Sequence, residues 1–325
     1  MKVAVTGGAG FLGSHVTNRL LAEGHDVVVI SDFSTGNNQN FADLNISPRL
    51  LVGDLRNTDF AMKSLKGMSK VYHFAADIGN VVYLHGSESN EQSSLRNNVA
   101  IDTNVIRSCA ENGVKELIYA SSVSVYSRTE QMGQNVTFKE EDTQRIIDPE
   151  GGYGWAKYIA ERQLQVLPKI RVGIARIFHA YGPNIYLKED RSQVIGSLIR
   201  KAVRYPKEDF VVWGDGTQKR SFLYIDDFLN ALFKLDNYVE QNGNLTVNVG
   251  STEETTIRDL AEAIVRTSGK HIPLKFDPSK PTGVLSRLPD ISRADKLLNW
   301  KPVVTLKEGL RKTYGWATTR LASED

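Results

Sequence analysis

Hydrophobic residues in this chain gather in short runs, and longer amphipathic segments separate these runs. The runs are rich in β-branched residues, which predicts buried strands; they cover residues 3–5, 27–30, 50–52, 71–74 and 117–119. Segments 14–23, 100–112 and 153–166 have helical spacing, and the first two end at Gly24 and Gly113, where glycine readily forms a left-handed helix end. Regular alternation of strand and helix predicts an α/β fold with a doubly wound parallel sheet.

The second half of the chain has a different pattern. Regular alternation continues to about residue 175, after which come the pair Gly182 and Pro183, a turn-rich segment at 213–216 and helices around 226–234 and 256–267. This mixed pattern predicts a smaller α/β lobe, and 325 residues are many for a single core. We therefore expect a first domain over residues 1–178 and a second over 179–325, with the chain crossing between the lobes.

Composition excludes several classes of protein. No apolar run approaches the roughly 20 residues that span a bilayer, and glycines interrupt the apolar stretch after Lys2 before a signal peptide could form. Cys109 is the only cysteine, so we expect no intramolecular disulfide, no paired-cysteine metal site and a cytoplasmic protein. The net charge is +2, with basic residues spread along the chain, which disfavours a nucleic-acid partner.

A glycine-rich loop links the first predicted strand to the first predicted helix. Gly7, Gly10 and Gly13 lie in the run TGGAGFLG, where they let the backbone approach a pyrophosphate at the helix N-terminus. Asp32 lies 19 residues after Gly13, at the end of the second strand, where a carboxylate accepts hydrogen bonds from a ribose 2′-hydroxyl and repels a 2′-phosphate. The pattern predicts a Rossmann domain that binds NAD. Asp54 follows the third strand and is a candidate adenine contact, although aspartate often only forms turns there.

A tyrosine and a lysine are spaced for chemistry beside this cofactor loop. Tyr153 and Lys157 are four residues apart on a predicted helix, so their side chains share one face. A phenol of pKa about 10 is a weak base near neutral pH, but a nearby ammonium and a nicotinamide cation stabilise the phenolate. The pair on its own is common on helix surfaces, and the cofactor loop makes the catalytic interpretation the better one.

Several motifs together carry a family resemblance. They are TGGAGFLG, HFAA at 73–76, ASSVSVY at 120–126, YGWAK at 153–157, YGP at 181–183 and WGDGTQKRSFLYIDD at 213–227. In this order they resemble the extended short-chain dehydrogenase/reductases that act on nucleotide-diphosphate sugars. The resemblance implies that Ser122 hydrogen-bonds a substrate hydroxyl, that Tyr153 removes its proton, and that Lys157 also holds the nicotinamide ribose while a hydride passes from C4 to NAD. It also implies a homodimer formed through helices 98–109 and 153–166, and further cofactor contacts from Phe11, Leu12, Leu55, Ala75 and Asn98.

Position 124 bears on the fate of the ketosugar that this oxidation forms. The 4,6-dehydratases resemble one another in an Asp-Glu pair at the places of Val123 and Ser124, so this sequence disfavours dehydration. Residues 76–79, which include the candidate substrate contact Asp77, and the run LKEGLRKTYGW are similar to GDP-mannose 3,5-epimerases. That branch has a cysteine at the place of Ser124 and a lysine at the place of Gln193. A serine with no acidifying partner visible in the sequence is a poor acid for this chemistry.

We therefore rank C4 epimerisation first, because it needs only the shared oxidation, rotation of the ketosugar and return of the hydride. A 3,5-epimerisation or another ketosugar isomerisation comes next, followed by 4,6-dehydration and net reduction by a ketoreductase. A non-catalytic nucleotide-sugar-binding protein belongs to a different class. The presence of Ser122, Tyr153 and Lys157 together argues against it.

The second lobe offers candidate contacts for a substrate diphosphate. Arg220 and Arg287 carry guanidinium groups, which match phosphate oxygens, although either can equally form a surface ion pair. His179 precedes the YGP motif where relatives commonly have asparagine, and we expect it to face the phosphates. Segments 79–97 and 184–193 are polar, and we expect irregular loops there that close over the sugar. No metal site is expected.

Overall fold

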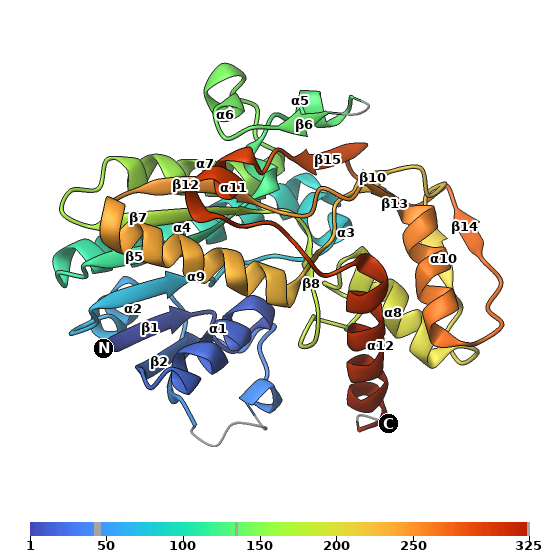
Figure 1. Cartoon of the computed structure of the whole chain (residues 1–325), viewed down its shortest axis with the longest axis horizontal. Coiled ribbons are helices and arrows are strands. Elements are labelled where there is room, and N and C mark those ends of the chain that lie inside the picture. The colour runs from blue at the N-terminus through green and yellow to red at the C-terminus, as the bar shows by residue number, and fades with distance from the viewer. Residues whose placement is uncertain (42–46, 134–135, 324–325) are drawn as a thin grey trace.

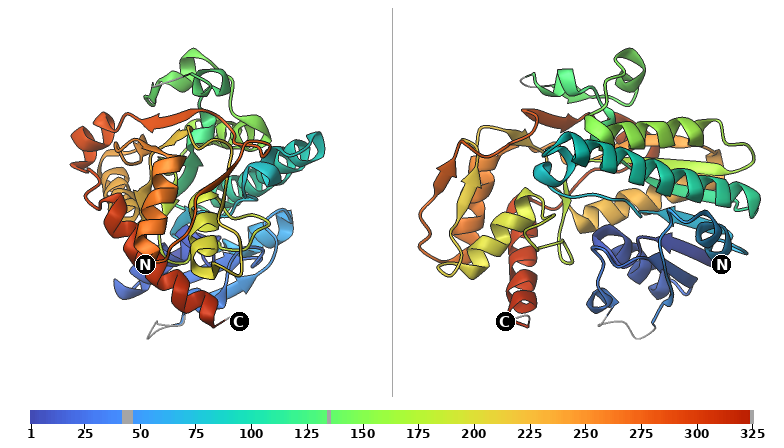
Figure 2. Two further views of the ribbon diagram at one scale, coloured as in Figure 1. Left: turned by 90° about the vertical axis from the view of Figure 1, so that its right-hand side faces the viewer. Right: turned by 180° about the vertical axis from the view of Figure 1, so that it is seen from behind.

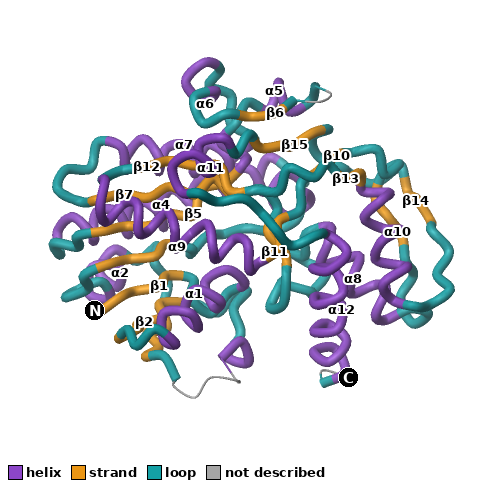
Figure 3. The backbone as a smooth tube through the Cα atoms, viewed as in Figure 1, coloured by secondary structure: helices purple, strands orange, loops and turns teal. Residues whose placement is uncertain are grey.

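The computed structural model describes residues 1–41, 47–133 and 136–323, and a parallel sheet runs through its centre (Figure 1, Figure 3). Among these residues, seven strands form the sheet in the order β12-β7-β5-β4-β1-β2-β3. Their bounds are β1 Lys2–Thr6, β2 Asp26–Ser31, β3 Arg49–Val52, β4 Lys70–His73, β5 Glu116–Ser122, β7 Arg171–Ile177 and β12 Leu245–Val249. The order reverses beside β1, and this is where parallel sheets of this type bind ligands.

Helices cover both faces of the sheet, and each face has its own hydrophobic core. On one face, α1 (Phe11–Ala22) and α9 (Ile225–Asn242) pack against residues such as Val3 and Val5. On the other, α2 (Thr58–Ser64), α4 (Glu88–Glu111) and α7 (Gly151–Gln165) pack against residues such as Ala4 and Val28. The two faces alternate along β1 because successive strand side chains point in opposite directions. Seen from behind, α4 and α7 lie next to each other (Figure 2).

A smaller lobe adjoins the C-terminal ends of these strands (Figure 1). Its helices are α8 (Val194–Arg204), α10 (Ile257–Ser268) and α12 (Leu306–Ala322). Its sheets order as β13-β10-β15-β6, β11-β8 and β14-β9. The strands are β6 Thr137–Phe138, β8 Ala180–Tyr181, β9 Val211–Trp213, β10 Lys219–Arg220, β11 Leu223–Tyr224, β13 Thr255–Thr256, β14 Lys275–Asp277 and β15 Ser286–Pro289. Short helices complete the chain: η1 Asn38–Phe41, α3 Val81–His85, η2 Val123–Val125, α5 Arg128–Gln131, α6 Asp142–Arg145 and α11 Ser292–Leu298.

The sequence prediction of the fold class is confirmed, and the structure corrects some of its elements. Gly24 and Gly113 have positive φ of 80° and 69°, as expected for helix ends. Helix α4 begins at Glu88 rather than near residue 100, because its first three turns are polar and give no apolar periodicity; Ser87 caps it by accepting from Asn90 N. Segment 79–97 is therefore mostly helical, and not the irregular loop we expected. No helix in the described part of the chain is long and apolar enough to cross a membrane.

The order of the strands also bears on the boundary between the two predicted domains at residue 178. Helix α9 and strand β12 lie beyond that residue, yet β12 pairs in parallel with β7 and α9 packs on the main sheet. Residues 225–249 therefore belong to the layers of the Rossmann sheet and not to the smaller lobe. The chain leaves the main sheet after β7, returns for α9 and β12, and leaves again (Figure 1).

Candidate active site

A cavity of about 660 Å³ lies between the C-terminal ends of the main strands and the smaller lobe. Loops after β1, β2, β3, β4 and β5 form one wall, because the carboxyl ends of parallel strands meet at one edge of a sheet. Segment 184–193 and the strand residues Arg220 and Arg287 form much of the other. The predicted site residues that line it are Gly7, Gly10, Phe11, Leu12, Gly13, Asp32, Asp54, Leu55, Ala75, Asp77, Ser122, Ser124, Tyr153, Lys157, His179, Arg220 and Arg287.

The glycine loop is built for close backbone approach. Gly7 has φ of +66°, and a Cβ added there would lie only 2.7 Å from Ala75 N. A Cβ on Gly13 would overlap the carbonyl oxygen of Gly7, so α1 can sit directly on the loop only with glycine at this position. Gly10 precedes α1 and brings no capping side chain. The first backbone N–H groups of α1 therefore face the cavity as donors for an anionic group such as a pyrophosphate.

Two acids mark the outer end of this wall. Asp32 is exposed after β2 and accepts from Ser34 N at 3.0 Å and from Ser34 Oγ at 2.8 Å. Asp54 receives Arg56 Nη2 at 2.7 Å, and this guanidinium lowers the pKa of the Asp54 carboxyl. Asp54 also accepts from Arg56 N, so it forms the local turn that aspartate commonly forms after a strand. A contact between Asp54 and adenine stays a prediction.

Asn98 is the one predicted site residue that does not line the cavity within the described structure. Its side chain is fully buried, accepts from Asp77 N at 2.8 Å and donates to Asp77 O at 2.9 Å. The Asn98 amide thus fixes the backbone of Asp77, and a contact between Asn98 and the cofactor stays a prediction.

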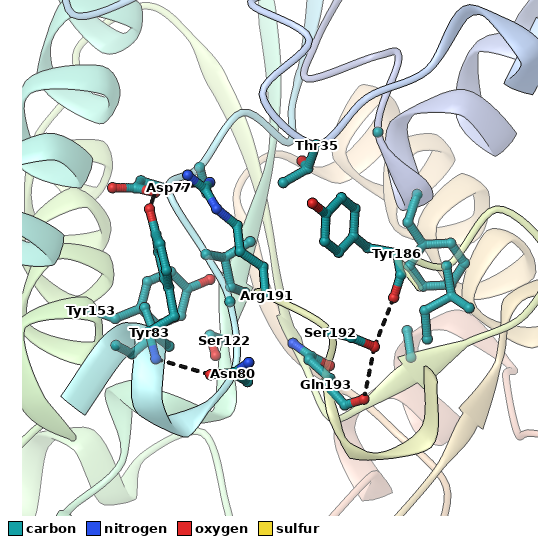
Figure 4. Close-up of a pocket in the computed structure, with 18 of the residues that line it drawn as sticks. Thr35, Asp77, Asn80, Tyr83, Ser122, Tyr153, Tyr186, Arg191, Ser192 and Gln193 are labelled. Carbon is teal, nitrogen blue, oxygen red and sulfur yellow. Dashed lines mark hydrogen bonds and ion pairs between the residues drawn. The ribbon is translucent and has the colours of Figure 1, made fainter. Parts of the chain in front are cut away.

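Ser122, Tyr153 and Lys157 meet at the base of the cavity (Figure 4 labels the first two). Ser122 ends β5, and Tyr153 and Lys157 stand one turn apart on α7. Burial, and then the Asp102 carboxylate, raise the pKa of Tyr153, whereas its hydrogen bond with Ser122 lowers it. Lys157 Nζ is 5.9 Å from the centre of the Tyr153 ring and 3.6 Å from Asp102 Oδ2. Asp102 was not among the residues that the sequence singled out, because an aspartate in a polar helix gives no signal of burial.

Ser124 has a carboxylate partner that the sequence did not reveal. Its Oγ donates to Glu150 Oε2 at 3.1 Å, and Glu150 N donates to Ser124 O at 2.9 Å. This buried carboxylate is a base beside the Ser124 hydroxyl and not an acidifying partner, because a nearby negative charge disfavours loss of the hydroxyl proton. Glu150 also pairs with Arg287. Burial raises the pKa of Glu150, but the Arg287 cation, together with smaller effects of His85, Ser124 and Arg220, lowers it overall. Gln193 lines the cavity as well, and its amide has no titratable proton.

The diphosphate candidates lie around the same carboxylate. Arg220 is almost fully buried and donates to Val284 O at 2.7 Å. Burial, and then the neighbouring Arg287 cation, lower the pKa of Arg220. Burial, and then the Arg287 and Arg220 cations, hold the pKa of His179 well below its usual value, so His179 is neutral. Arg287 thus pairs with Glu150, and Arg220 interacts with that carboxylate through its charge. Two cations beside one carboxylate leave this part of the cavity suited to an anion.

Asp77 joins two loops across the cavity. Tyr83 donates to Asp77 Oδ1 at 2.5 Å and Asn97 to Oδ2 at 2.8 Å, while Arg191 Nη1 lies 3.4 Å from Oδ1. Arg191 belongs to segment 184–193, which is irregular as expected, and its guanidinium lies 4.3 Å from the centre of the Tyr83 ring. Figure 4 shows Asp77, Tyr83 and Arg191 together in the pocket that Tyr153 and Ser122 also line. The sequence did not single out Arg191, since its partners are distant along the chain.

Comparisons with known proteins agree with this arrangement. The profile of the NAD dependent epimerase/dehydratase family matches residues 3–250. GDP-mannose 3,5-epimerase from Arabidopsis thaliana is 32% identical, over all of this chain and 84% of that protein. UDP-glucuronic acid decarboxylase 1 from the same plant is 30% identical, over all of this chain and 72% of its own length. The structure of UDP-glucose 4-epimerase from Thermotoga maritima, solved with UDP-glucose, superimposes with a TM-score of 0.84 at 25% identity, covering 99% of this chain and 100% of that one.

Proposed function

This chain belongs to the NAD-dependent epimerase/dehydratase family, and on that premise we propose that it interconverts nucleotide sugars at C4. The observation that carries the proposal is the meeting of Ser122, Tyr153 and Lys157 at the base of one cavity, between the glycine loop and the two arginines. The substrate is oxidised to a 4-ketosugar, which turns within the cavity and is reduced on its other face. No acid or base beyond the shared set is needed for this outcome.

Each residue of this set has a defined task in the proposal. Ser122 accepts or donates a hydrogen bond at the reacting hydroxyl, and Tyr153 takes the hydroxyl proton and later returns it. Lys157 keeps a positive charge below the phenol, which favours the phenolate. Gly7 and Gly13 let the pyrophosphate of NAD approach the backbone, and Asp32 receives the ribose hydroxyls. NAD, when bound, supplies the acceptor for the hydride.

The smaller lobe would hold the nucleotide end of the substrate. The relatives are named for GDP-mannose and UDP-glucuronic acid, and the superimposed structure contains UDP-glucose; all three are sugars on a nucleoside diphosphate. Arg220 and Arg287 supply donors for the two phosphates, and neutral His179 supplies one more polar group beside them. Asp77 lies at the sugar end, where Tyr83, Asn97 and Arg191 fix its carboxylate.

A second candidate function is 3,5-epimerisation of a GDP-hexose. The hydrogen bond from Ser124 to Glu150 favours it, because that pair places a base near the sugar, and so does the 32% identity to a 3,5-epimerase. The amide at Gln193 disfavours it, since exchange of carbon-bound protons at two positions needs a second acid or base. We therefore keep C4 epimerisation as the first function.

Proton NMR in deuterated water tests the choice directly. Purified protein with NAD is incubated with UDP-, GDP-, CDP- and dTDP-hexoses, and products are identified by coupling constants. A C4 epimer without solvent deuterium supports the proposal, whereas deuterium at C3 or C5 supports the second candidate. A 4-keto-6-deoxy product, or net reduction of a ketosugar, would overturn both. Tyr153→Phe is the control, and we expect at least about a hundredfold loss of turnover with NAD binding unchanged.

The proposal also covers the oligomeric state of the protein and its compartment in the cell. A homodimer formed by α4 and α7 would bury the half-exposed Trp155 and the exposed Val166, both of which lie at α7. We place this enzyme in the cytoplasm, in keeping with its single buried cysteine. Light scattering over a range of protein concentrations tests the assembly, and a monomer at every concentration would remove the dimer from the proposal.

A further inference from the structure

A closed cluster of charged and polar side chains lies behind the reacting tyrosine. It consists of Asp102 on α4, His73 at the end of β4, Tyr119 on β5 and Lys157 on α7. Asp102 and His73 are each about 1% exposed, and neither is among the described residues that line the cavity. The cluster therefore meets the active site only through Lys157.

Asp102 is the counterion of Lys157. The ammonium lies 3.6 Å from Asp102 Oδ2 and 4.6 Å from the centre of the Tyr119 ring, and only 2% of the lysine is exposed. An ammonium without a partner at such a depth loses its proton, because burial penalises the charged form. Glu161 lies on the same helix, but its carboxylate is taken by Arg176 and by Ser121.

Two further side chains fix the position of Asp102. Tyr119 OH donates to Oδ2 at 2.8 Å, and His73 Nε2 lies 3.0 Å from Oδ1. On the other side of the ring, His73 Nδ1 lies 2.6 Å from Thr6 Oγ1, which already accepts from Ala75 N. The threonine hydroxyl is thus free to donate to Nδ1, which leaves the ring hydrogen on Nε2, facing Asp102. A neutral histidine in this tautomer orients the carboxylate without competing with Lys157 as a second cation.

We propose that Asp102 is a positioning residue that holds Lys157 as a fixed cation beneath Tyr153. The inference rests on the roles proposed above for Tyr153 and Lys157. The titratable groups that face one another here are His73, Asp102, Tyr119, Tyr153, Lys157 and Glu161. The Asp102 charge supports the lysine cation and opposes the tyrosine phenolate. The effect on Lys157 is the larger one, because Lys157 is in direct contact with Asp102.

Asp102→Asn removes the negative charge of Asp102, and the asparagine amide can still form polar contacts with Tyr119 and His73. The amide oxygen can accept from Tyr119 OH, and the amide NH₂ can donate to His73 Nε2 once the ring hydrogen moves to Nδ1, where Thr6 Oγ1 accepts it. We therefore expect this variant to fold. Tyr119→Phe is the matched control, since it removes a hydrogen bond to the same oxygen and leaves the Asp102 charge in place.

The test follows the protonation of Lys157 in the NAD-bound protein, so it needs no substrate. Lysine labelled with ¹³C at Cε and ¹⁵N at Nζ is titrated by NMR, and the signal missing in Lys157→Arg assigns the residue. We expect Lys157 to be cationic at pH 8, and Asp102→Asn to lower its titration midpoint by about one to three pH units. Tyr119→Phe should move it by less than about half a unit. A neutral Lys157 at pH 8 in the unaltered protein, or equal shifts in the two variants, would overturn the proposal.

Turnover separates this inference from the proposed function. With any nucleotide sugar that the unaltered enzyme converts, the alkaline limb of the pH profile for kcat should move to lower pH in Asp102→Asn, while Tyr119→Phe keeps the profile. A uniform loss of kcat with no movement of the limb would show a merely structural role. If no nucleotide sugar is converted, the proposed function fails, and the Lys157 titration still decides the role of Asp102.

Discussion

Asp102 and Glu150 are two buried carboxylates near the catalytic residues, and they differ in whether a ligand can reach them. Asp102 is sealed among protein groups behind Lys157, whereas Glu150 lines the cavity beside Arg287. Both pair with a cation at close range. In an ion pair enclosed by protein, the cation has no other anion to bind. In an ion pair that lines an open cavity, the cation can leave its carboxylate and bind the anionic group of a ligand. The Asp102 pair therefore keeps Lys157 protonated, whereas the Glu150 pair leaves Arg287 available to a substrate.

The largest expected difference between the two ion pairs is in the free energy of unfolding that is lost when the cation is removed. Lys157→Met leaves Asp102 buried without a counterion, and we expect the free energy of unfolding to fall by about 3–5 kcal/mol. Arg287→Met leaves Glu150 with Ser124, Arg220 and access to the cavity, and we expect a loss of only about 1–2 kcal/mol. Urea unfolding followed by fluorescence measures both values. Equal losses would mean that the two pairs are equally enclosed, which would break the comparison.

An intermediate effect concerns ligand affinity. If Glu150 gives up Arg287 to a diphosphate, Glu150→Gln should bind UDP-glucose or GDP-mannose about threefold to tenfold more tightly, because a like charge is removed from the site. Calorimetry in a Tyr153→Phe background avoids turnover. Glu141→Gln is the control, since Glu141 is exposed and pairs with Arg293 outside the cavity. Weaker binding in Glu150→Gln would instead assign Glu150 the task of orienting Arg287.

The last effect is a pH dependence that a ligand should reduce by about one third. Burial lowers the pKa of His15 and of His73, and burial together with Arg287 and Arg220 lowers the pKa of His179. The unfolded chain therefore binds more protons below about pH 6.5, so stability is complete above that pH and falls as the pH drops further. Each histidine contributes up to about 1.4 kcal/mol per pH unit.

Saturating UDP-glucose should reduce this slope from that of three histidines to that of two, because phosphate stabilises the cation of His179, whereas His15 and His73 do not line the cavity. Calorimetric melting between pH 5.5 and 7.5 measures the slope. His271→Asn is the control, since His271 is exposed. An unchanged slope with bound ligand would show that His179 does not face the phosphates.

The part of the site that the sequence could predict is the part that depends on local spacing. The glycine loop is a single turn formed by Gly7, Gly10 and Gly13, and the catalytic pair Tyr153 and Lys157 lies within one turn of a helix. Their spacing can therefore be recognised in the sequence. Asp102 and Glu150 act on partners that the fold brings from other elements, and nothing beside them in the chain marks them. The doubly wound sheet could be predicted from its apolar runs, but the start of α4 could not, because its first turns are polar and only the Ser87 cap marks them.

The return of the chain to the main sheet at β12 has a consequence for its synthesis. Strand β7 emerges from the ribosome with one edge unpaired, and its partner β12 is made roughly 70 residues later, from Leu245 opposite Gly173 to Val249 opposite Ile177. At the usual speed of translation this delay is roughly 3–14 s. During that time an apolar strand presents free backbone groups to any other nascent chain. Protection of that edge during synthesis is therefore a requirement that this topology places on the cell that makes the protein.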